Sequence, residues 1–427
     1  MKVLIVGGGG REHAIALKIK ENPKVTALYA APGNGGIAQI ATCLPFKATD
    51  VDGIVRWAAE NKVDFVIVAP DDPLCLGMVD ALAEQGIPAF GPRKNAAIIE
   101  GSKVFSKNLM KKHGIPTAAY ETFDDYDAAV KYLQTADMPI VVKADGLALG
   151  KGVLICPDRE SAVEAVASMM KEAKFGASGA RVVIEEFLTG PEVSVLAFTD
   201  GKTVKPMASS MDHKRALDHD EGLNTGGMGT IAPNPCYTPE LARRCMDEIF
   251  LPTIAAMNAE GRTFTGCLYF GLMMTPKGPK VIEYNCRFGD PETQVVLPLL
   301  KSDLLTIMRA TVDGTLADTP VEFASGAACC VVLASGGYPV SYKSGYPISG
   351  LDEASKTATV FHAGTKLVDG QIVTAGGRVL GVTATADTLE AAIDKAYQAA
   401  DKITFTDMHM RRDIGQRALA SRKESHS

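Results

Sequence analysis

The chain has 427 residues, of which 46% are hydrophobic and 22% charged, and its formal net charge at pH 7 is −6. These values are ordinary for a globular protein of about three domains, and the acidic balance argues against nucleic acid or an anionic membrane as partner. No segment offers the roughly 18 uncharged apolar residues of a membrane helix, and a strand rather than a signal peptide follows Met1. The nine cysteines form no C-x-x-C motif. We therefore expect reduced thiols and a cytoplasmic location.

Residues 1–100 alternate between strand and helix patterns. We expect strands over 2–6, 25–30, 65–68 and 87–90, with a turn at 7–10 and a helix over 11–20. This alternation predicts a parallel sheet covered by helices on both faces. Ligands of such sheets bind beyond the carboxyl ends of the strands, where the Gly-rich turns of this segment fall.

The turn at residues 7–13 (GGGGREH) resembles a dinucleotide-binding turn but fails the G-x-G-x-x-G fingerprint. Glu12 or His13 stands where the third glycine is required, and no acid ends the second strand. The start of a helix still favours anions. A phosphate monoester therefore fits this turn better than NAD.

A second Gly-rich loop, residues 143–152 (KADGLALGKG), lies in an α/β unit predicted over 120–190. Its glycines allow backbone amides to approach phosphate oxygens, and its lysines add positive charge. Gly152 stands where a Walker A loop requires Ser or Thr, so the loop is not of that type. A hairpin turn with surface lysines explains the pattern equally well.

Three further segments carry weaker signals. Residues 185–188 (EEFL) end a strand, and Glu192 follows shortly after. The backbone edge of 185–188 can pair with an adenine, and the Glu192 carboxylate can bind a ribose, although an amphipathic edge strand is the stronger alternative. Residues 212–215 (DHKR) and 224–229 (NTGGMG) combine charge with glycine amides that can wrap an anion. Each of these two is, by itself, more often an ordinary loop.

The most informative segment is 283–292 (EYNCRFGDPE), which continues a strand predicted at 280–282. Because side chains alternate along a strand, Glu283, Asn285 and Arg287 should share one face. A carboxylate and an amide oxygen suit Mg²⁺ completed by phosphate and water, and a guanidinium can grip a phosphate or carboxylate with two hydrogen bonds. The acids of the following turn favour a site over a surface salt bridge.

The last hundred residues indicate a separate mixed α/β domain that begins with a strand over 327–333. The arginines near the C-terminus, Arg411, Arg412 and Arg417, are expected on a solvated helix face and chain end. The strand at 267–272 (CLYFGL) contains no acid.

Several segments recur in order in the phosphoribosylamine–glycine ligase family, also called glycinamide ribonucleotide synthetases, which the chain resembles over its whole length. They are 9–14 (GGREHA), 31–34 (APGN), 142–148 (VKADGLA), 224–229 (NTGGMG), 287–292 (RFGDPE) and 411–415 (RRDIG). The resemblance implies an α/β (α+β) multidomain fold. A preATP-grasp parallel-sheet domain would span 1–101, an ATP-grasp core 102–325 with a mobile lid near 123–188, and a C-terminal mixed α/β domain 326–427.

The resemblance also implies an ATP-dependent carbon–nitrogen ligase of purine biosynthesis. It would join glycine to 5-phosphoribosylamine through glycyl phosphate, with ATP and Mg²⁺ or Mn²⁺ as cofactors, as a monomer with only small-molecule partners. The implied ATP-binding residues are Lys103, Lys143, Gly150, Glu185, Glu186, Phe187, Leu188 and Glu192, and the implied metal ligands are Glu283 and Asn285. The implied substrate-binding residues are Gly9, Gly10, Arg11, Asn34, Asp212, Lys214, Gly226, Gly227 and Arg287, with Arg287, Lys143 and Asp290 as catalytic residues.

Two departures from the family pattern leave questions open. Many ATP-grasp enzymes carry a metal-binding acid on the strand that here reads 267–272, so the number of metal ions is open. Asp71 stands where the family often has Glu. The alternatives are another ATP-grasp carboxylate–amine ligase, a nicotinamide oxidoreductase and a catalytically inactive nucleotide-binding protein.

Overall fold

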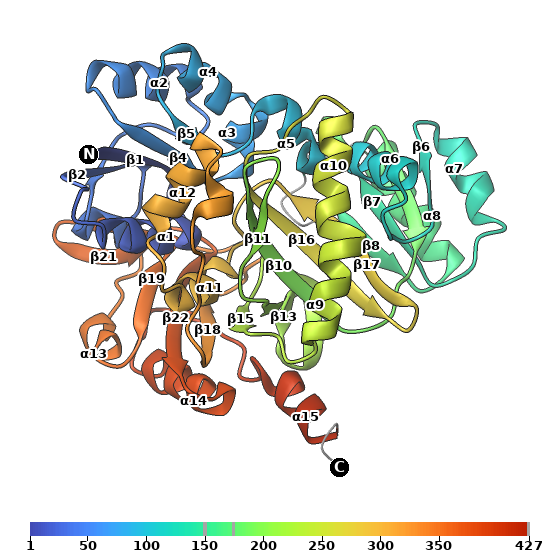
Figure 1. Cartoon of the computed structure of the whole chain (residues 1–427). Helices are drawn as coiled ribbons and strands as arrows, with labels where there is room; N and C mark the ends of the chain where they lie inside the picture. The colour runs from blue at the N-terminus through green and yellow to red at the C-terminus, as the bar shows by residue number, and fades with distance from the viewer. Residues whose placement is uncertain (148–151, 173–175, 425–427) are drawn as a thin grey trace.

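The computed structural model describes residues 1–147, 152–172 and 176–424 (Figure 1). Its N-terminal part is a parallel sheet in the order β3-β2-β1-β4-β5. The strands are β1 (Lys2–Gly7), β2 (Ala27–Pro32), β3 (Thr42–Cys43), β4 (Phe65–Val68) and β5 (Ala89–Phe90). The helices around it are α1 (Gly10–Lys20), α2 (Val51–Glu60), α3 (Asp71–Cys75), α4 (Met78–Glu84) and α5 (Lys94–Gly101).

Strand β1 shows why this sheet is covered on both faces. Val3 and Ile5 pack into one hydrophobic cluster, whereas Leu4 and Val6 pack into another on the opposite face. A parallel sheet buried in this way reads as a continuous apolar run, as β1 does. Helix α3 begins at Asp71, shortly after β4 ends. Acids in the first turn stabilise a helix N-terminus, and this signal outweighs the turn-forming prolines.

The central part contains an antiparallel sheet in the order β11-β10-β16-β17. Helices α6 (Lys103–His113), α9 (Pro239–Cys245) and α10 (Leu251–Ala259) belong to this part, and a π-helical turn (Met246–Phe250) joins the last two. The strands are β10 (Glu192–Thr199), β11 (Val204–Pro206), β16 (Gly266–Thr275) and β17 (Gly278–Asn285).

A smaller antiparallel sheet, in the order β6-β9-β7-β8, projects from the molecule at the right of Figure 1. It has its own hydrophobic cluster, to which helices α7 and α8 contribute Leu133 and Val166. The elements are β6 (Tyr120–Phe123), α7 (Tyr126–Leu133), β7 (Ile140–Ala144), β8 (Val153–Cys156), α8 (Arg159–Met170) and β9 (Val182–Glu186). A unit with a separate core can change its angle to the rest with little repacking.

A fourth sheet, in the order β12-β15-β18-β22-β19, joins the central and C-terminal parts. Its strands are β12 (Met211–Asp212), β15 (Gly229–Ala232), β18 (Ala327–Ala334), β19 (Thr359–His362) and β22 (Arg378–Ala386). The hairpins are β13 (Arg215–Leu217) with β14 (Glu221–Asn224), and β20 (Thr365–Val368) with β21 (Gln371–Thr374). The remaining helices are α11 (Thr293–Leu299), α12 (Leu304–Asp313), α13 (Leu351–Ser355), α14 (Leu389–Ala400) and α15 (Gln416–Glu424). Because β15 pairs with β18, the loop before β15 is held against the C-terminal part.

Among the helices in the described ranges, none has both the length and the apolar character needed to cross a membrane.

Candidate active site

A cavity of about 440 Å³ lies where the N-terminal, central and C-terminal parts meet the small β6-β9-β7-β8 sheet. Most of its polar lining is charged, as expected for a site that handles anions. The charged residues around it are Arg11, Asp71, Glu100, Lys103, Lys107, Lys143, Asp212, Lys214, Glu283, Arg287, Asp290, Glu292 and Arg378. They come from segments far apart in the sequence.

A β-bulge in β17 directs the central motif into this cavity. Gly271 of β16 pairs with Glu283, whereas the next residue, Leu272, pairs with Val281, so Ile282 is the extra residue. A bulge of this kind reverses the alternation of side chains. Val281 and Tyr284 therefore both lie in the core, while Glu283 lies in the cavity lining. Asn285 and Arg287 also line the cavity, as the predicted shared face requires.

Glu100, at the end of α5, holds this motif in place. Its Oε1 accepts hydrogen bonds from Asn285 Nδ2 (3.1 Å) and pairs with Arg287 Nη2 (2.9 Å), and its Oε2 accepts one from the Cys286 backbone N–H (2.7 Å). Burial raises the pKa of Glu100, while the Arg287 guanidinium opposes that rise. Glu100 was not predicted from the sequence, since no local pattern marks an acid at a helix end as a partner of a distant strand.

The two candidate metal ligands present oxygens of the right kind. Asn285 Nδ2 donates to Glu100 and to the Tyr284 carbonyl (2.9 Å), which leaves its Oδ1 as an acceptor. Burial opposes ionisation of Glu283, but Lys214, whose Nζ lies 3.5 Å from Oε1, and Lys143 hold its pKa below the ordinary value. Within the described residues, no three His, Cys, Asp or Glu side chains gather as a metal site. A cation here would therefore need phosphate or water oxygens, as Mg²⁺ usually does.

Three lysines line the side of the cavity nearest the small sheet. Lys143 Nζ and Lys107 Nζ pair with the two oxygens of the buried Glu185 carboxylate, at 2.5 Å and 2.6 Å. Lys103 Nζ donates to the Gly146 carbonyl (2.7 Å). Burial lowers the pKa of Lys107 to about 8. The Glu185 side chain thus serves as the counter-ion of this cluster, and Lys107 is a member that the sequence analysis missed.

The pairing of β9 determines which part of the predicted adenine edge is available to a ligand. Strands on both sides occupy the Glu185 backbone, so only the chain beyond Glu186, at Phe187 and Leu188, leaves the sheet as an unpaired edge. Glu192 begins β10 and lies close enough to Lys214 to raise its pKa, although Glu283 is the main cause of that rise. Gly150 lies outside the described residues.

At the N-terminal turn, protein carboxylates occupy several donors expected to bind an anion. The Gly9 N–H donates to Glu12 Oε2 (2.7 Å), and the Arg11 N–H donates to Asp290 Oδ2 (3.1 Å). The Arg11 side chain contacts Glu12 and the Phe288 carbonyl and lines the cavity.

Two other predicted residues at this turn pack within the protein. Asn34 donates to the Gly8 and His362 carbonyls and accepts from the Gly36 and Ile37 N–H groups. The Gly10 Cα is backed by Gln294, whose Nε2 lies 2.4 Å from where a Cβ would stand. Asn34 and Gly10 therefore fix the shape of the turn, and Arg11 is the predicted side chain of this group that reaches the cavity.

Asp290 and the glycine loop meet at Arg378, a C-terminal residue that the sequence analysis missed. Arg378 Nη1 donates to the carbonyls of Gly226 (2.9 Å) and Asp290 (2.9 Å), and Nη2 lies 3.5 Å from Asp290 Oδ1. The Gly227 backbone, with φ of 123°, packs so closely on Asp212 that a Cβ would lie 2.7 Å from its Oδ1. A side chain at this position would displace that carboxylate.

Asp212 and Glu292 form an acidic side of the cavity. Ser194 contacts the Tyr269 hydroxyl (2.9 Å), which in turn donates to Glu292 Oε1 (3.2 Å). Burial and the Glu292 carboxylate raise the pKa of Asp212 well above its ordinary value. In the described part of the chain, neither acid forms an ion pair with Lys or Arg, because Lys214 pairs with Glu283 and Arg378 with Asp290. This side is therefore suited to a cationic group of a ligand.

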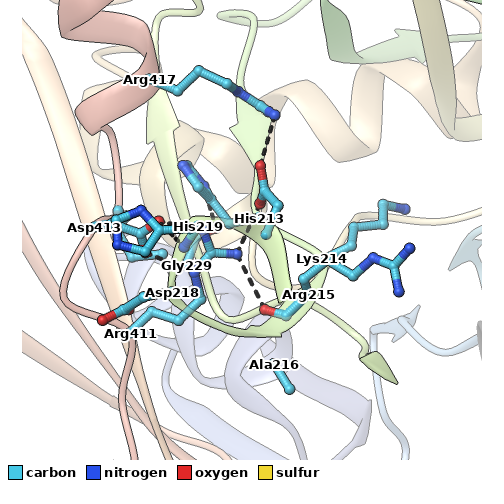
Figure 2. A network of polar contacts seen from close by, with 12 residues as sticks. His213, Lys214, Arg215, Ala216, Asp218, His219, Gly229, Arg411, Asp413 and Arg417 are labelled. Carbon is cyan, nitrogen blue, oxygen red and sulfur yellow. Dashed lines mark hydrogen bonds and ion pairs between the residues drawn. The ribbon is translucent and has the colours of Figure 1, made fainter. Parts of the chain in front are cut away.

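Arg411 corrects the expectation of a solvated C-terminal arginine cluster, because its side chain is only 1% exposed. It contacts Asp413, Asp220 and the Arg215 carbonyl (Figure 2). An arginine is buried in this way only when its donors are paired.

Comparisons with known proteins cover the whole chain. The models of the phosphoribosylglycinamide synthetase N domain, ATP-grasp (A) domain and C domain match residues 1–100, 101–293 and 328–417. A phosphoribosylamine–glycine ligase of Halalkalibacterium halodurans is 48% identical, covering 100% of this chain and 99% of that protein. Another, from Allochromatium vinosum, is 50% identical over 98% of this chain and 99% of that protein.

Solved structures agree with these matches. The crystal structure of a phosphoribosylamine–glycine ligase from Thermotoga maritima superposes with a TM-score of 0.86 at 34% identity, covering 97% of this chain and 100% of that one. A biotin carboxylase from Campylobacter jejuni, 15% identical with a TM-score of 0.73 over 96% of this chain and 92% of that one, shares the fold. Full-length matches of domains, sequence and structure lead to one conclusion: the chain belongs to the phosphoribosylglycinamide synthetase family of ATP-grasp ligases.

Proposed function

We propose that this protein is a phosphoribosylamine–glycine ligase that activates glycine as glycyl phosphate. The observation that supports it best is that Glu283, Asn285 and Arg287 line the same cavity as Lys103 and Lys143. This arrangement gathers positive charge and a cation site where a phosphoryl group would be transferred. ATP-grasp membership makes ATP the expected phosphoryl donor.

The proposed reaction has two steps. In the first, a carboxylate oxygen of glycine attacks the γ-phosphorus of ATP, the bond to the β-phosphate oxygen breaks, and ADP leaves. In the second, the amine of phosphoribosylamine attacks the carbonyl carbon of glycyl phosphate, phosphate leaves, and the nitrogen loses a proton. Two anions meet in the first step, so positioning and charge neutralisation by Lys143 and Arg287 should supply most of the catalysis.

The proposed cation site is Glu283 with Asn285. The ionised carboxylate and the free amide oxygen fit Mg²⁺ or Mn²⁺, since both prefer oxygen ligands. When bound, the ion would neutralise phosphate charge. The strand that lacks an acid, β16, instead presents the Tyr269 hydroxyl to the cavity.

We further propose that Asp212 and Glu292 receive the ammonium group of glycine. They are acids of the cavity without a lysine or arginine partner among the described residues. Tyr269 donates a hydrogen bond to Glu292 Oε1 and so fixes the position of this carboxylate. Arg287 would hold the carboxylate of glycine or its acyl phosphate, because its fork can contact two oxygens.

The remaining assignments follow from position. Lys103, the Phe187–Leu188 edge and Glu192 would bind the nucleotide, and Arg11 with the Gly226–Gly227 loop would face phosphoribosylamine. Asp290 is proposed to orient these groups through its contacts with the Arg11 backbone and Arg378. We also propose that the protein is a cytoplasmic monomer with only small-molecule partners. Sedimentation analysis of the purified protein tests the monomeric state.

Isotope transfer tests the proposed intermediate. Glycine labelled with ¹⁸O in both carboxylate oxygens should deliver one label to the released phosphate, because the attacking oxygen stays bonded to phosphorus. Mass spectrometry of the phosphate reads this directly. Product formation with unlabelled phosphate would refute glycyl phosphate while leaving the ligase activity intact.

A further inference from the structure

The C-terminal segment 409–417 lies along the hairpin formed by β13 and β14, and we call this segment the clasp (Figure 2). Arg411 forms its centre. The Arg411 guanidinium contacts both oxygens of Asp413, with Nε and Nη2 each at 2.8 Å. Its Nη1 reaches the hairpin at Asp220 Oδ1 (3.0 Å) and the Arg215 carbonyl (3.1 Å). One buried side chain thus ties the C-terminal segment to β13 and to the turn of the hairpin.

Backbone groups extend this contact along the clasp. The Arg412 N–H donates to Asp218 (2.7 Å), and the His219 N–H donates to Asp413 Oδ2 (2.9 Å). The His409 ring contacts the Ala216 carbonyl (2.7 Å). The hairpin therefore has partners in the clasp at its turn as well as on β13.

The turn of the hairpin has a backbone that requires such support. His219 and Asp220 have φ values of 61° and 57°, in the left-handed region. A non-glycine residue is uncommon there, although His and Asp are among the types that adopt this conformation most often. Such conformations persist when the surroundings fix them. Here the fixing groups are Asp413 and Arg411.

The hairpin connects directly to the active site. Lys214, immediately before β13, lies 3.5 Å from Glu283. Its carbonyl accepts hydrogen bonds from the Thr225 N–H (2.7 Å) and hydroxyl (2.8 Å), just before the Gly226–Gly227 loop. A second connection passes through His213, whose Nδ1 contacts the Gly229 carbonyl and whose Nε2 accepts from the Gly415 N–H (3.1 Å). Both ends of the loop are therefore coupled to the clasp.

We propose that Arg411 is a positioning residue that holds Lys214 and the Gly226–Gly227 loop in the geometry needed for the ligase reaction. Its side chain is buried away from the cavity and does not line it. The claim that Arg411 keeps the hairpin folded in place does not depend on the proposed function. The claim that Arg411 affects catalysis rests on that function. The test therefore measures both the local stability of the hairpin, by proteolysis, and the ligase activity.

Arg411→Lys and Asp413→Asn test the proposal, with Arg412→Ala as the matched control. Lysine keeps the charge but cannot contact Asp413, Asp220 and the Arg215 carbonyl together. The Arg412 side chain belongs to the same segment, but it is 56% exposed and pairs with Asp401 instead. Circular dichroism melting first establishes that each variant is folded.

Trypsin provides the readout that needs no activity, because it cleaves after Lys214 and Arg215. We expect cleavage at these sites to be about tenfold faster in Arg411→Lys and Asp413→Asn, since local opening exposes the backbone. In the ligase assay, kcat should fall by about 100-fold, as for a small misplacement of a reacting group. ADP affinity should stay within about twofold, because the lysine cluster and the adenine edge lie on other elements.

The outcomes separate the structural role of the clasp from the catalytic positioning role of Arg411. Unchanged cleavage and unchanged kcat in folded Arg411→Lys and Asp413→Asn would overturn the proposal. Faster cleavage with unchanged kcat would overturn the positioning role while leaving the structural clasp. An equal effect of Arg412→Ala would show a general disturbance of the segment and would also overturn it. If wild-type protein has no ligase activity, the proposed function fails, whereas the cleavage comparison still tests the clasp.

Discussion

Glu100→Gln is the substitution that most sharply tests how the central motif is held. The carboxylate accepts from Asn285, Arg287 and the Cys286 backbone through two oxygens. Glutamine has nearly the same shape but one acceptor oxygen, so its amide nitrogen would face a donor on one side. The backbone at Cys286 and the Arg287 guanidinium would then no longer be held in a fixed position.

The size of the effect follows from burial. The Arg287 and Glu100 side chains are 18% and 6% exposed, so solvent screens their interaction little. Removing one partner of a buried pair costs about 3–5 kcal/mol, and we expect about 3 kcal/mol because glutamine keeps part of the hydrogen bonding. The loss of a preorganised donor at the reacting phosphoryl group should lower kcat by about 100-fold.

Urea unfolding followed by circular dichroism measures the stability, and initial rates of ADP release measure kcat. Glu84→Gln is the control, because Glu84 ends the neighbouring helix α4 and its side chain is exposed. Wild-type stability and kcat in Glu100→Gln would refute the view that Glu100 positions Arg287. A loss of the same size in Glu84→Gln would refute the specific role.

Three other predictions concern different parts of the molecule. Arg287→Lys should lower kcat by about 100-fold, because an ammonium cannot replace the fork, and steady-state rates with unchanged kcat would remove Arg287 from the mechanism. Asp212→Asn should weaken glycine binding by at least about tenfold in calorimetry. In the wild type this binding should strengthen as pH rises through the raised pKa of Asp212, because only the ionised acid attracts the ammonium. Binding that is independent of pH and unaffected by Asp212→Asn would contradict the proposed subsite. Burial lowers the pKa of His13 to about 3 and that of His362 to about 4, so below pH 6.5 the unfolded chain binds more protons than the folded protein. The free energy of unfolding should therefore decrease as the pH is lowered, by up to roughly 1.4 kcal/mol per pH unit for each histidine. His13→Gln should flatten this slope in urea unfolding between pH 6.5 and 5, and an unchanged slope would contradict the assignment.

Local patterns predicted the parts of the fold that local physics determines. The apolar run of β1 and the strand of β4 were predicted because a buried strand requires continuous hydrophobic residues. The shared face of Glu283, Asn285 and Arg287 was also predicted, and these residues line one cavity. The bulge at Ile282 was not, since it depends on pairing with Gly271 of another strand.

The residues that support the site could not be predicted for a related reason. Glu100 and Arg378 act on segments distant in the sequence, and only the tertiary structure reveals those contacts. Arg411 lies in a segment whose composition is that of a solvated chain end. Its burial depends on Asp413 of the same segment and on Asp220, which the turn of the β13–β14 hairpin supplies. Charge patterns identify groups that can pair, whereas topology determines which of them do.

The most direct test of the proposed function is ADP release from ATP and Mg²⁺ with glycine and phosphoribosylamine each omitted in turn. We predict turnover in the complete mixture and loss of sustained turnover when either substrate is absent. Absence of turnover in the complete mixture, with protein shown to be folded, would contradict the proposed reaction. Full turnover without phosphoribosylamine would contradict the coupling of glycine activation to the second step.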